Sequence, residues 1–395
     1  MHPARRWSTA LAALSVVAAT ACAAPVAGAA RPAQLIDLPT GSGEPAPGIV
    51  VPPPQGNGQI LEAIRLAAAT PIVREQFPDR TNPCSTTGEL VAPRDVEATS
   101  FPEGTVAPVL AKYGFVTAWR ACASNAEGWW TVTQSAELSD PAAARHAVVE
   151  LAAASLVSGE RQTTVLGGAT AQVRVEEETE VVQIWVPVGR LFGYVFHQAP
   201  AGVALAEATR LAEVHSRLLA SFTPTPQAGV PDVPDDPAGL SELTVRPPGD
   251  AVRGSGPFDL EATLHSSTDP IADRALLTAN GFRGSFRWLT YDGAHSYAAV
   301  LQAFPGPAQA EAVRQAFVTS DAGAEGRVPF TLPGAPDASC FRTDRSVPSL
   351  ASFYQRCYAS RGAHLVWVDI DAIRSVDDTA AMTTLLAAQI DLIDG

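Results

Sequence analysis

A strict alternation of side chains over residues 129–138 predicts a β-strand, because a period of two places successive residues on opposite faces of a sheet. One face would carry Trp130, Val132, Gln134 and Ala136, and the other Thr131, Thr133, Ser135 and Glu137. We expect Trp130 to be buried in the core. Trp129 points the opposite way, so we expect it to be an exposed aromatic residue that could bind a ligand.

Helical and strand patterns recur on both sides of this strand. The helical period and its end signals predict helices over residues 57–69, 105–112, 140–157, 205–222, 269–280, 307–318 and 378–393. Strand patterns cover residues 115–122, 171–177, 181–197 with a break near 187–189, 282–291, 296–304, 352–358 and 364–370. Residues 78–103 are predicted to form a loop. Strands that pair as hairpins between helices favour an α+β fold, an antiparallel sheet packed with helices.

An internal duplication organises the chain. Residues 110–115 (Leu-Ala-Lys-Tyr-Gly-Phe) return 167 positions later as residues 277–282 (Leu-Thr-Ala-Asn-Gly-Phe). Residues 165–169 return 166 positions later as residues 331–335. A nearly constant offset over this length predicts two tandem similar domains. We place them at residues 58–222 and 258–395, joined by a proline-rich linker at residues 223–257.

The first 57 residues predict a targeting segment and a tether. Arg5 and Arg6 precede an apolar stretch at residues 9–21, which is shorter than the roughly 20 residues of a transmembrane helix. We therefore predict a signal peptide at residues 1–21. The end of this segment with the next residue, Ala19-Thr20-Ala21-Cys22, resembles a bacterial lipobox, in which the cysteine thiol receives a diacylglycerol. Leu or Val is usual at the position of Ala19. The alternative is ordinary cleavage after Ala29 and secretion. Residues 22–57, rich in Pro and Gly, are predicted to be a tether.

The cysteine count supports an oxidising compartment. The chain has five cysteines, and four remain if Cys22 carries lipid. An even number outside the cytoplasm predicts two disulfides, for which three pairings exist. We favour the local pairing, Cys84 with Cys122 and Cys340 with Cys357. A zinc site is the rival interpretation, but the chain has neither a Cys-x-x-Cys nor a nearby histidine pair.

The net charge and the absence of known motifs argue against several classes of function. The net charge of −14 argues against nucleic acid as a partner. We find no Gly-x-Ser-x-Gly, His-Glu-x-x-His, phosphate loop or dinucleotide fingerprint, so we predict no catalytic, cofactor-binding or metal-binding residue. We interpret the glutamates of residues 176–180 as a solvated turn, and Asp377 or Asp378 as a helix cap. Six scattered histidines leave open a Ser-His-Asp group that only folding would assemble: His146, His197, His215, His265, His295 and His364.

Several stretches together resemble a family of actinobacterial lipoproteins of unknown function, common in mycobacteria and nocardiae. They are Leu-Ile-Asp-Leu-Pro-Thr-Gly at residues 35–41, the helix at residues 61–67, the Tyr-Gly-Phe turn at residues 113–115, and the alanine-rich helices after each hairpin. The resemblance implies a two-part protein anchored at the cell surface. It implies no activity and no catalytic residue.

The leading hypothesis is a non-enzymatic, lipid-anchored cell-envelope protein that binds an unknown ligand or protein partner outside the membrane. The alternatives are a secreted hydrolase whose catalytic group forms only in the fold, and a structural spacer of the envelope. We expect function where the two copies differ, including the Trp129 face, the turn at residues 176–180 and the groove between the halves.

Overall fold

The computed structural model describes residues 58–394 apart from 85–86, 157–159, 167, 235, 252–253, 325, 344–352 and 373–377. The predicted signal peptide at residues 1–21, Cys22 with the rest of the tether, and Asp377 lie outside the described residues.

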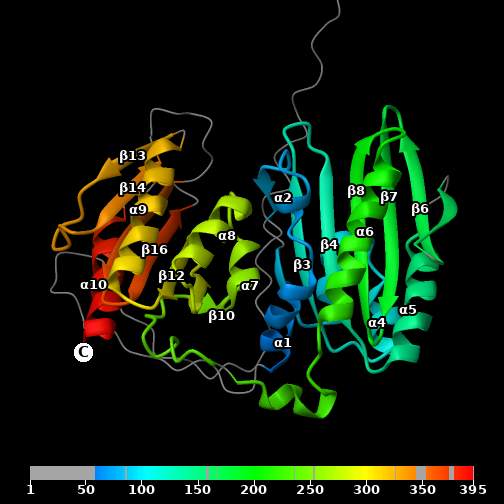
Figure 1. The fold of residues 1–395 in the computed structure, drawn as a ribbon, viewed down its shortest axis with the longest axis horizontal. Coiled ribbons are helices and arrows are strands. Elements are labelled where there is room, and N and C mark those ends of the chain that lie inside the picture. Colours follow the sequence, from blue (N-terminus) through cyan, green and yellow to red (C-terminus); the bar gives the residue numbers. More distant parts are fainter. Residues whose placement is uncertain are drawn as a thin grey trace, which may run out of the picture.

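The first half forms an antiparallel eight-stranded sheet with helices on both faces (Figure 1). Its strands run in the order β1-β3-β4-β8-β7-β6-β5, and β2 also pairs with β3. They are β1 (Asn82–Pro83), β2 (Gly88–Leu90), β3 (Thr117–Ser124), β4 (Trp130–Glu137), β5 (Arg161–Val165), β6 (Ala169–Glu176), β7 (Thr179–Val188) and β8 (Leu191–Pro200). The helices are α1 (Gly58–Leu66), α2 (Val73–Gln76), α3 (Pro93–Ser100), α4 (Ala107–Lys112), α5 (Pro141–Ala154) and α6 (Ala204–Ser221), with 3₁₀ turns at Ala67–Ala69 and Gln227–Asp232.

The second half repeats this architecture. Its sheet order is β10-β11-β12-β16-β15-β14-β13, and β9 also pairs with β11. The strands are β9 (Asp250–Ala251), β10 (Gly256–Phe258), β11 (Gly284–Tyr291), β12 (His295–Ala303), β13 (Arg327–Phe330), β14 (Ser339–Thr343), β15 (Phe353–Arg361) and β16 (His364–Ala372). The helices are α7 (Leu260–Leu264), α8 (Pro270–Ala279), α9 (Pro307–Gly323) and α10 (Thr379–Asp394). The α+β prediction with two similar antiparallel sheets is confirmed.

The duplicated sequence block has the same conformation in both copies. Gly114 and Gly281 each follow a helix with a positive φ, 66° and 64°, which glycine adopts without a Cβ penalty. The amide of Phe115 donates to the Leu110 carbonyl at 3.1 Å, and the amide of Phe282 donates to the Leu277 carbonyl at 3.0 Å. The block is therefore a helix end that leads into a core strand.

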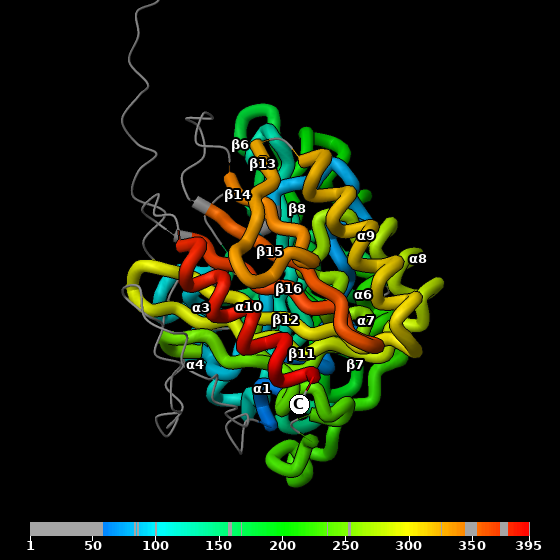
Figure 2. Tube along the Cα trace, turned by 90° about the vertical axis from the view of Figure 1, so that its left-hand side faces the viewer, coloured from blue at the N-terminus to red at the C-terminus, as the bar shows by residue number. Residues whose placement is uncertain are grey.

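Helices α1, α2, α7 and α8 lie between the two sheets (Figure 1), whereas α10 lies across the outer face of the second sheet (Figure 2). One apolar cluster between the sheets joins the halves: Ile64, Leu66, Trp119, Leu219, Phe258 and Ala262. Polar contacts also cross between the halves. His265 Nε2 donates to the Ala67 carbonyl at 3.0 Å, and Arg274 Nε to Glu75 Oε1 at 2.8 Å.

Both faces of β4 are covered after Trp130, which the alternation alone does not predict. Thr131, Thr133, Ser135 and Glu137 on the polar face are all fully buried. Thr133 Oγ1 donates to the Pro71 carbonyl at 2.8 Å, and Ser135 Oγ to the Ala69 carbonyl at 3.1 Å. The hydroxyl groups thus satisfy backbone carbonyls of the segment that follows α1, so this polar face packs against protein instead of water.

Several short elements differ from the sequence-based expectation. Residues 78–103, predicted to be a loop, contain β1, β2 and α3. Strands of two or three residues show no detectable period, and β1 and β2 exist because they pair with β3. Residues 240–245 of the linker form a turn, whose Leu240 and Val245 pack into the core of the second half.

Candidate functional site

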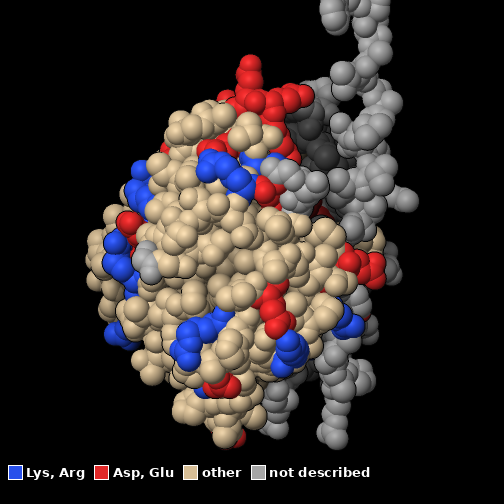
Figure 3. All heavy atoms as spheres, turned by 90° about the vertical axis from the view of Figure 1, so that its right-hand side faces the viewer, with Lys and Arg blue, Asp and Glu red and all other residues tan. Residues whose placement is uncertain are grey.

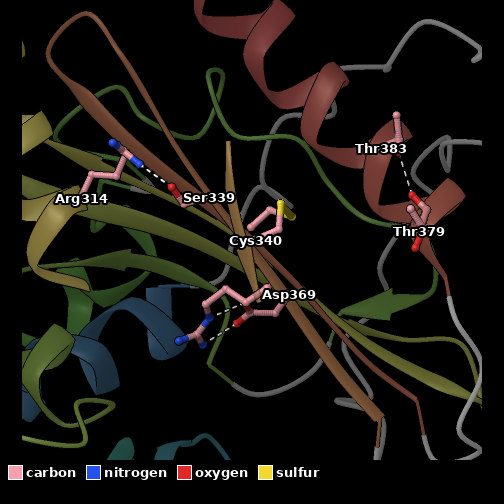
Figure 4. Close-up of a disulfide and its surroundings, with 8 residues drawn as sticks. Arg314, Ser339, Cys340, Asp369, Thr379 and Thr383 are labelled. Atoms are coloured by element: carbon pink, nitrogen blue, oxygen red, sulfur yellow. Dashed lines mark hydrogen bonds and ion pairs between the residues drawn. A yellow bond between two sulfur atoms is a disulfide. The ribbon is translucent and has the colours of Figure 1, made fainter. Parts of the chain in front are cut away.

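The two disulfides use the local pairing that we favoured from the sequence. Cys84 is joined to Cys122 on β3, and Cys340 on β14 to Cys357 on β15 (Figure 4). Cys340 and Cys357 are direct cross-strand partners, with Cα atoms 4.1 Å apart. The first bridge links the segment between β1 and β2 to β3. The second links neighbouring strands of one sheet.

The structure reverses the expected roles of two tryptophans. Trp130 is 40% exposed, whereas Trp129 is half-buried with its ring 5.9 Å from the Arg80 guanidinium. Arg80 Nη1 also donates to the Trp129 carbonyl at 3.0 Å. Helix α5 packs over the far end of β4, around Ala136 and Leu138, and leaves the start of the strand uncovered. The predictions of an exposed Trp129 and a core Trp130 are therefore wrong.

A row of four side chains crosses the α5 side of the first sheet. We call it the polar row: Arg120 on β3, Gln134 on β4, Tyr194 on β8 and Trp185 on β7, each the register partner of the next. All four are at least nine-tenths buried. The Tyr194 hydroxyl donates to Gln183 Oε1 at 2.9 Å, and burial raises the pKa of Tyr194 well above its ordinary value.

Both amide atoms of Gln134 and Nε1 of Trp185, in this row, have no hydrogen-bond partner among the described residues. The ring of Phe101, from the turn between α3 and α4, lies over the row, 5.2 Å from the Tyr194 ring and 5.6 Å from the Trp185 ring. Buried polar groups are nearly always hydrogen-bonded, so this row requires an explanation.

The same face becomes more exposed toward Trp130. Val132 and Phe196 come next along β4 and β8, and Phe196 is partly exposed. The Trp130 amide donates to Gln198 Oε1 at 2.9 Å. Figure 3 shows that on the side of the molecule turned away from the second sheet, uncharged surface is interspersed with basic and acidic groups, and carboxylates gather along the upper edge. The face therefore combines a polar interior with an aromatic, exposed end.

The structure assembles two hydroxyl–imidazole groups on the opposite face of the first sheet. Thr131 Oγ1 lies 2.9 Å from His197 Nδ1, and His197 Nε2 lies 3.0 Å from Glu207 Oε2. Ser135 Oγ lies 2.8 Å from His215 Nε2, and burial lowers the pKa of His215 to about 3. Both hydroxyl groups are fully buried. A substrate could reach them only if the packing around β4 opened.

The acidic stretches form no metal centre in the described part of the chain. Glu176, Glu177 and Glu178 are exposed at the turn between β6 and β7, whereas Glu180 is buried, 3.4 Å from Arg161. Asp378 precedes α10, and its carbonyl accepts from the Met382 amide at 2.9 Å. No group of three or more His, Cys, Asp or Glu residues in the described segments is arranged to hold a metal ion.

A charged cluster lies on the α9 side of the second sheet (Figure 4). Arg356 binds Asp369 through two hydrogen bonds of 2.6 and 2.8 Å, and Arg314 Nη1 donates to Ser339 Oγ at 2.9 Å. The Tyr358 hydroxyl accepts from Arg356 Nη1 at 3.1 Å and donates to Asp321 Oδ2 at 2.9 Å. Bidentate pairing satisfies these charges within the protein, so this cluster has a structural role.

Residues 50–235 match a family described as a domain of unknown function (DUF7373), N-terminal. No curated protein matches the sequence. Within the part that the structure describes, no helix is long and apolar enough to cross a membrane.

Three solved structures show weak similarity. The extracellular domain of PknH from Mycobacterium tuberculosis is 15% identical over 30% of this chain and 69% of its own, with a TM-score of 0.23. TP0453 is 10% identical over 70% of this chain and 84% of its own, with a TM-score of 0.21. The immunity protein TplEi of the T6SS from Pseudomonas aeruginosa, complexed with "L" peptide, is 10% identical over 70% of this chain and 89% of its own, with a TM-score of 0.23. TM-scores this low establish neither a shared fold nor a shared function.

Proposed function

We propose that the protein is a lipid-anchored, extracytoplasmic binding module of the cell envelope and not an enzyme. The observation that carries this proposal is the use of the cysteines. All four cysteines after Cys22 are joined in two disulfides, which form and persist in oxidising compartments. Cys22 is then the one cysteine without a disulfide partner, at the end of an apolar signal-like stretch, where a lipid would be attached.

A binding role is supported by which side chains are buried and which are exposed. The hydroxyl groups beside His197 and His215 are buried, whereas the Trp130 side chain is 40% exposed at the start of β4. Exposed aromatic residues beside polar groups are typical of recognition surfaces. The resemblance to actinobacterial surface lipoproteins points the same way.

The lipid anchor is tested by the Cys22→Ala substitution in the full-length chain. We expect wild-type protein in the membrane fraction and the variant in the soluble extracytoplasmic fraction, because one thiol carries the attachment. Mass spectrometry of the N-terminal peptide should show a diacylglyceryl group on Cys22. Thr20→Ala, which keeps the cysteine, is the control and should stay at the membrane. A Cys22→Ala variant that remains membrane-bound would contradict the anchor, and a mature chain that begins at residue 30 would show secretion instead.

The binding role is tested separately, by crosslinking in the intact envelope and native mass spectrometry of the purified protein. A specific partner or bound molecule is expected. Covalent labelling by a fluorophosphonate probe, lost in Ser135→Ala, would instead favour the hydrolase. A chain with neither partner, ligand nor label would contradict the binding role and leave the structural spacer.

A further inference from the structure

His295, the first residue of β12, lies between two carboxyl groups. Its Nδ1 is 3.2 Å from Oδ2 of Asp292, in the turn between β11 and β12. Its Nε2 is 3.2 Å from Oδ2 of Asp378, which directly precedes α10. An ionised carboxylate can only accept hydrogen bonds, and neutral imidazole donates from one nitrogen, whereas imidazolium donates from both. The observed geometry therefore fits the protonated form of His295.

Asp292 is held in its ionised form by donors of its own hairpin. Oδ1 accepts from the amides of Ala294 at 2.9 Å and His295 at 2.7 Å, and Oδ2 accepts from the Tyr297 hydroxyl at 3.0 Å. Burial raises the pKa of Asp292, but these hydrogen bonds outweigh burial, so the pKa lies below its ordinary value. When the ring is neutral, its one N–H therefore stays on Nδ1, facing this carboxylate. The contact between Nε2 and Asp378 then has no donor on the ring.

The neighbouring elements place their other titratable groups away from these two contacts. The Tyr297 ring lies 5.7 Å from the His295 ring, and its hydroxyl already donates to the carboxylate in the turn. Asp371 on β16 and Asp250 on β9 belong to the register row of Ser296, the next residue along β12. Because successive residues point to opposite faces of a sheet, both of these side chains lie on the face that His295 does not occupy.

The contact with Asp378 attaches the start of α10 to β12. The Asp378 amide also donates to Gln355 Oε1 at 3.0 Å. The second half of the helix is held separately, because Gln389 binds the linker through both of its amide atoms, at 2.9 and 2.6 Å. Met382, in the first turn of α10, is fully buried. Loss of the imidazole contact would therefore loosen the first turn over Met382 and leave the rest of the helix in place.

We propose that His295 is a pH-dependent latch for the start of α10. In acidic surroundings the imidazolium bridges Asp292 and Asp378 and holds the first turn of the helix against the sheet. When the ring loses one proton, the bridge to Asp378 is lost and the first turn opens more often. The inference depends on neither the lipid anchor nor the proposed binding role.

Met382 supplies the probe for the test. The chain has two methionines, Met1 and Met382, so the mature chain keeps only the second. Its thioether does not titrate, and hydrogen peroxide converts an accessible thioether to the sulfoxide. The tryptic peptide of residues 375–395 contains Met382, and its mass reports the added oxygen. The rate of this oxidation therefore measures how often the first turn of α10 opens.

The test compares pH 5 with pH 8, because histidine side chains ordinarily change charge between these values. It uses the full mature chain with Cys22→Ala. We expect Met382 to be oxidised about two- to fivefold more slowly at pH 5, the factor that a partly exposed ion pair provides. The ¹⁵N spectrum of the His295 ring at pH 5 should show both nitrogens protonated.

Two variants assign the effect to the bridge. His295→Gln and Asp378→Asn should each be oxidised at pH 5 as fast as the wild type is at pH 8. His146→Gln, which changes an exposed histidine of α5, is the control and should keep the wild-type ratio of rates. Equal rates at the two pH values in the wild type would overturn the latch. So would a wild-type ratio in either bridge variant, or a neutral His295 ring at pH 5.

Discussion

At the scale of single residues, burial determines the pH at which Glu137 is protonated. Its side chain is fully buried on the polar face of β4, 2.7 Å from Arg190 Nη2. Burial raises its pKa to about 7, and the Arg190 charge opposes this only in part. Between pH 4.5 and 7 the folded state therefore binds more protons here than the unfolded state does. The contribution to stability is complete below pH 4.5 and is lost as the pH rises through 7.

Glu137→Gln should flatten this part of the stability profile. We expect the free energy of unfolding of the wild type to fall by up to about 3 kcal/mol more than that of the variant between pH 4.5 and 8. Denaturant titrations at several pH values measure the difference. Glu178→Gln, on the exposed turn, is the matched control and should follow the wild type. If Glu137→Gln and wild type have parallel pH profiles, the raised pKa is wrong.

At the scale of elements, the first sheet shows which residues occupy the position of the second disulfide in the other copy of the duplication. The hairpin partners Val188 and Leu191 correspond to Arg361 and His364, so Cys357 takes the place of Ile184. Ile184 is the register partner of Ala171, as Cys357 is of Cys340. An apolar pair thus occupies in the first sheet the position that a covalent bond occupies in the second.

The double variant Cys340→Ala/Cys357→Ile should keep the second sheet and lose stability. The bridge joins residues 17 positions apart, and closing a loop of this length contributes about 3 kcal/mol through the entropy of the unfolded chain. We expect an unchanged circular dichroism spectrum. When both proteins are measured under reducing conditions, so that Cys84–Cys122 is open in each, their denaturation midpoints should be close. A variant with lost sheet signal would show that the bridge is needed to form β14 and β15.

The helices and long strands could be predicted from sequence because each carries its own period and end signals. In the helix predicted at residues 140–157, Asp140 caps α5 by accepting from the Ala142 and Ala143 amides, and Pro141 occupies the first helical position. The short strands β1, β2 and β9 carry no period, since pairing with a longer strand alone defines them. The candidate site was missed for a related reason. The alternation placed Gln134 on the core face, but only the register with β3, β8 and β7 shows that its neighbours leave it unpartnered.

At the scale of the whole molecule, the two halves share a core. Ile64 and Leu66 of α1 pack with Trp119 of the first sheet and with Phe258 of β10. Ile72, just before α2, packs with Leu264, Leu277 and Phe304 of the second half. Ile64, Leu66 and Ile72 thus bury apolar surface of both halves. Neither half would keep its full core if it were separated from the other.

We therefore expect the mature chain to unfold in one cooperative thermal transition, although it contains two similar domains. Differential scanning calorimetry should give a single peak whose calorimetric and van't Hoff enthalpies agree. Leu66→Asp, which places a charge in the shared cluster, should split or broaden this peak. Two separate transitions in the wild type would show that the halves are independent.

The position of α1 also determines where a force applied at the N-terminus would act. Residues 1–57 join the folded protein at Gly58, at the start of the helix that lies between the two sheets. Tension on a membrane-attached N-terminus would therefore load the contact between the halves directly, instead of an outer edge of either sheet. If the N-terminus is anchored as proposed, stretching from this end should detach α1 from the apolar side chains around it and separate the halves before either sheet unfolds.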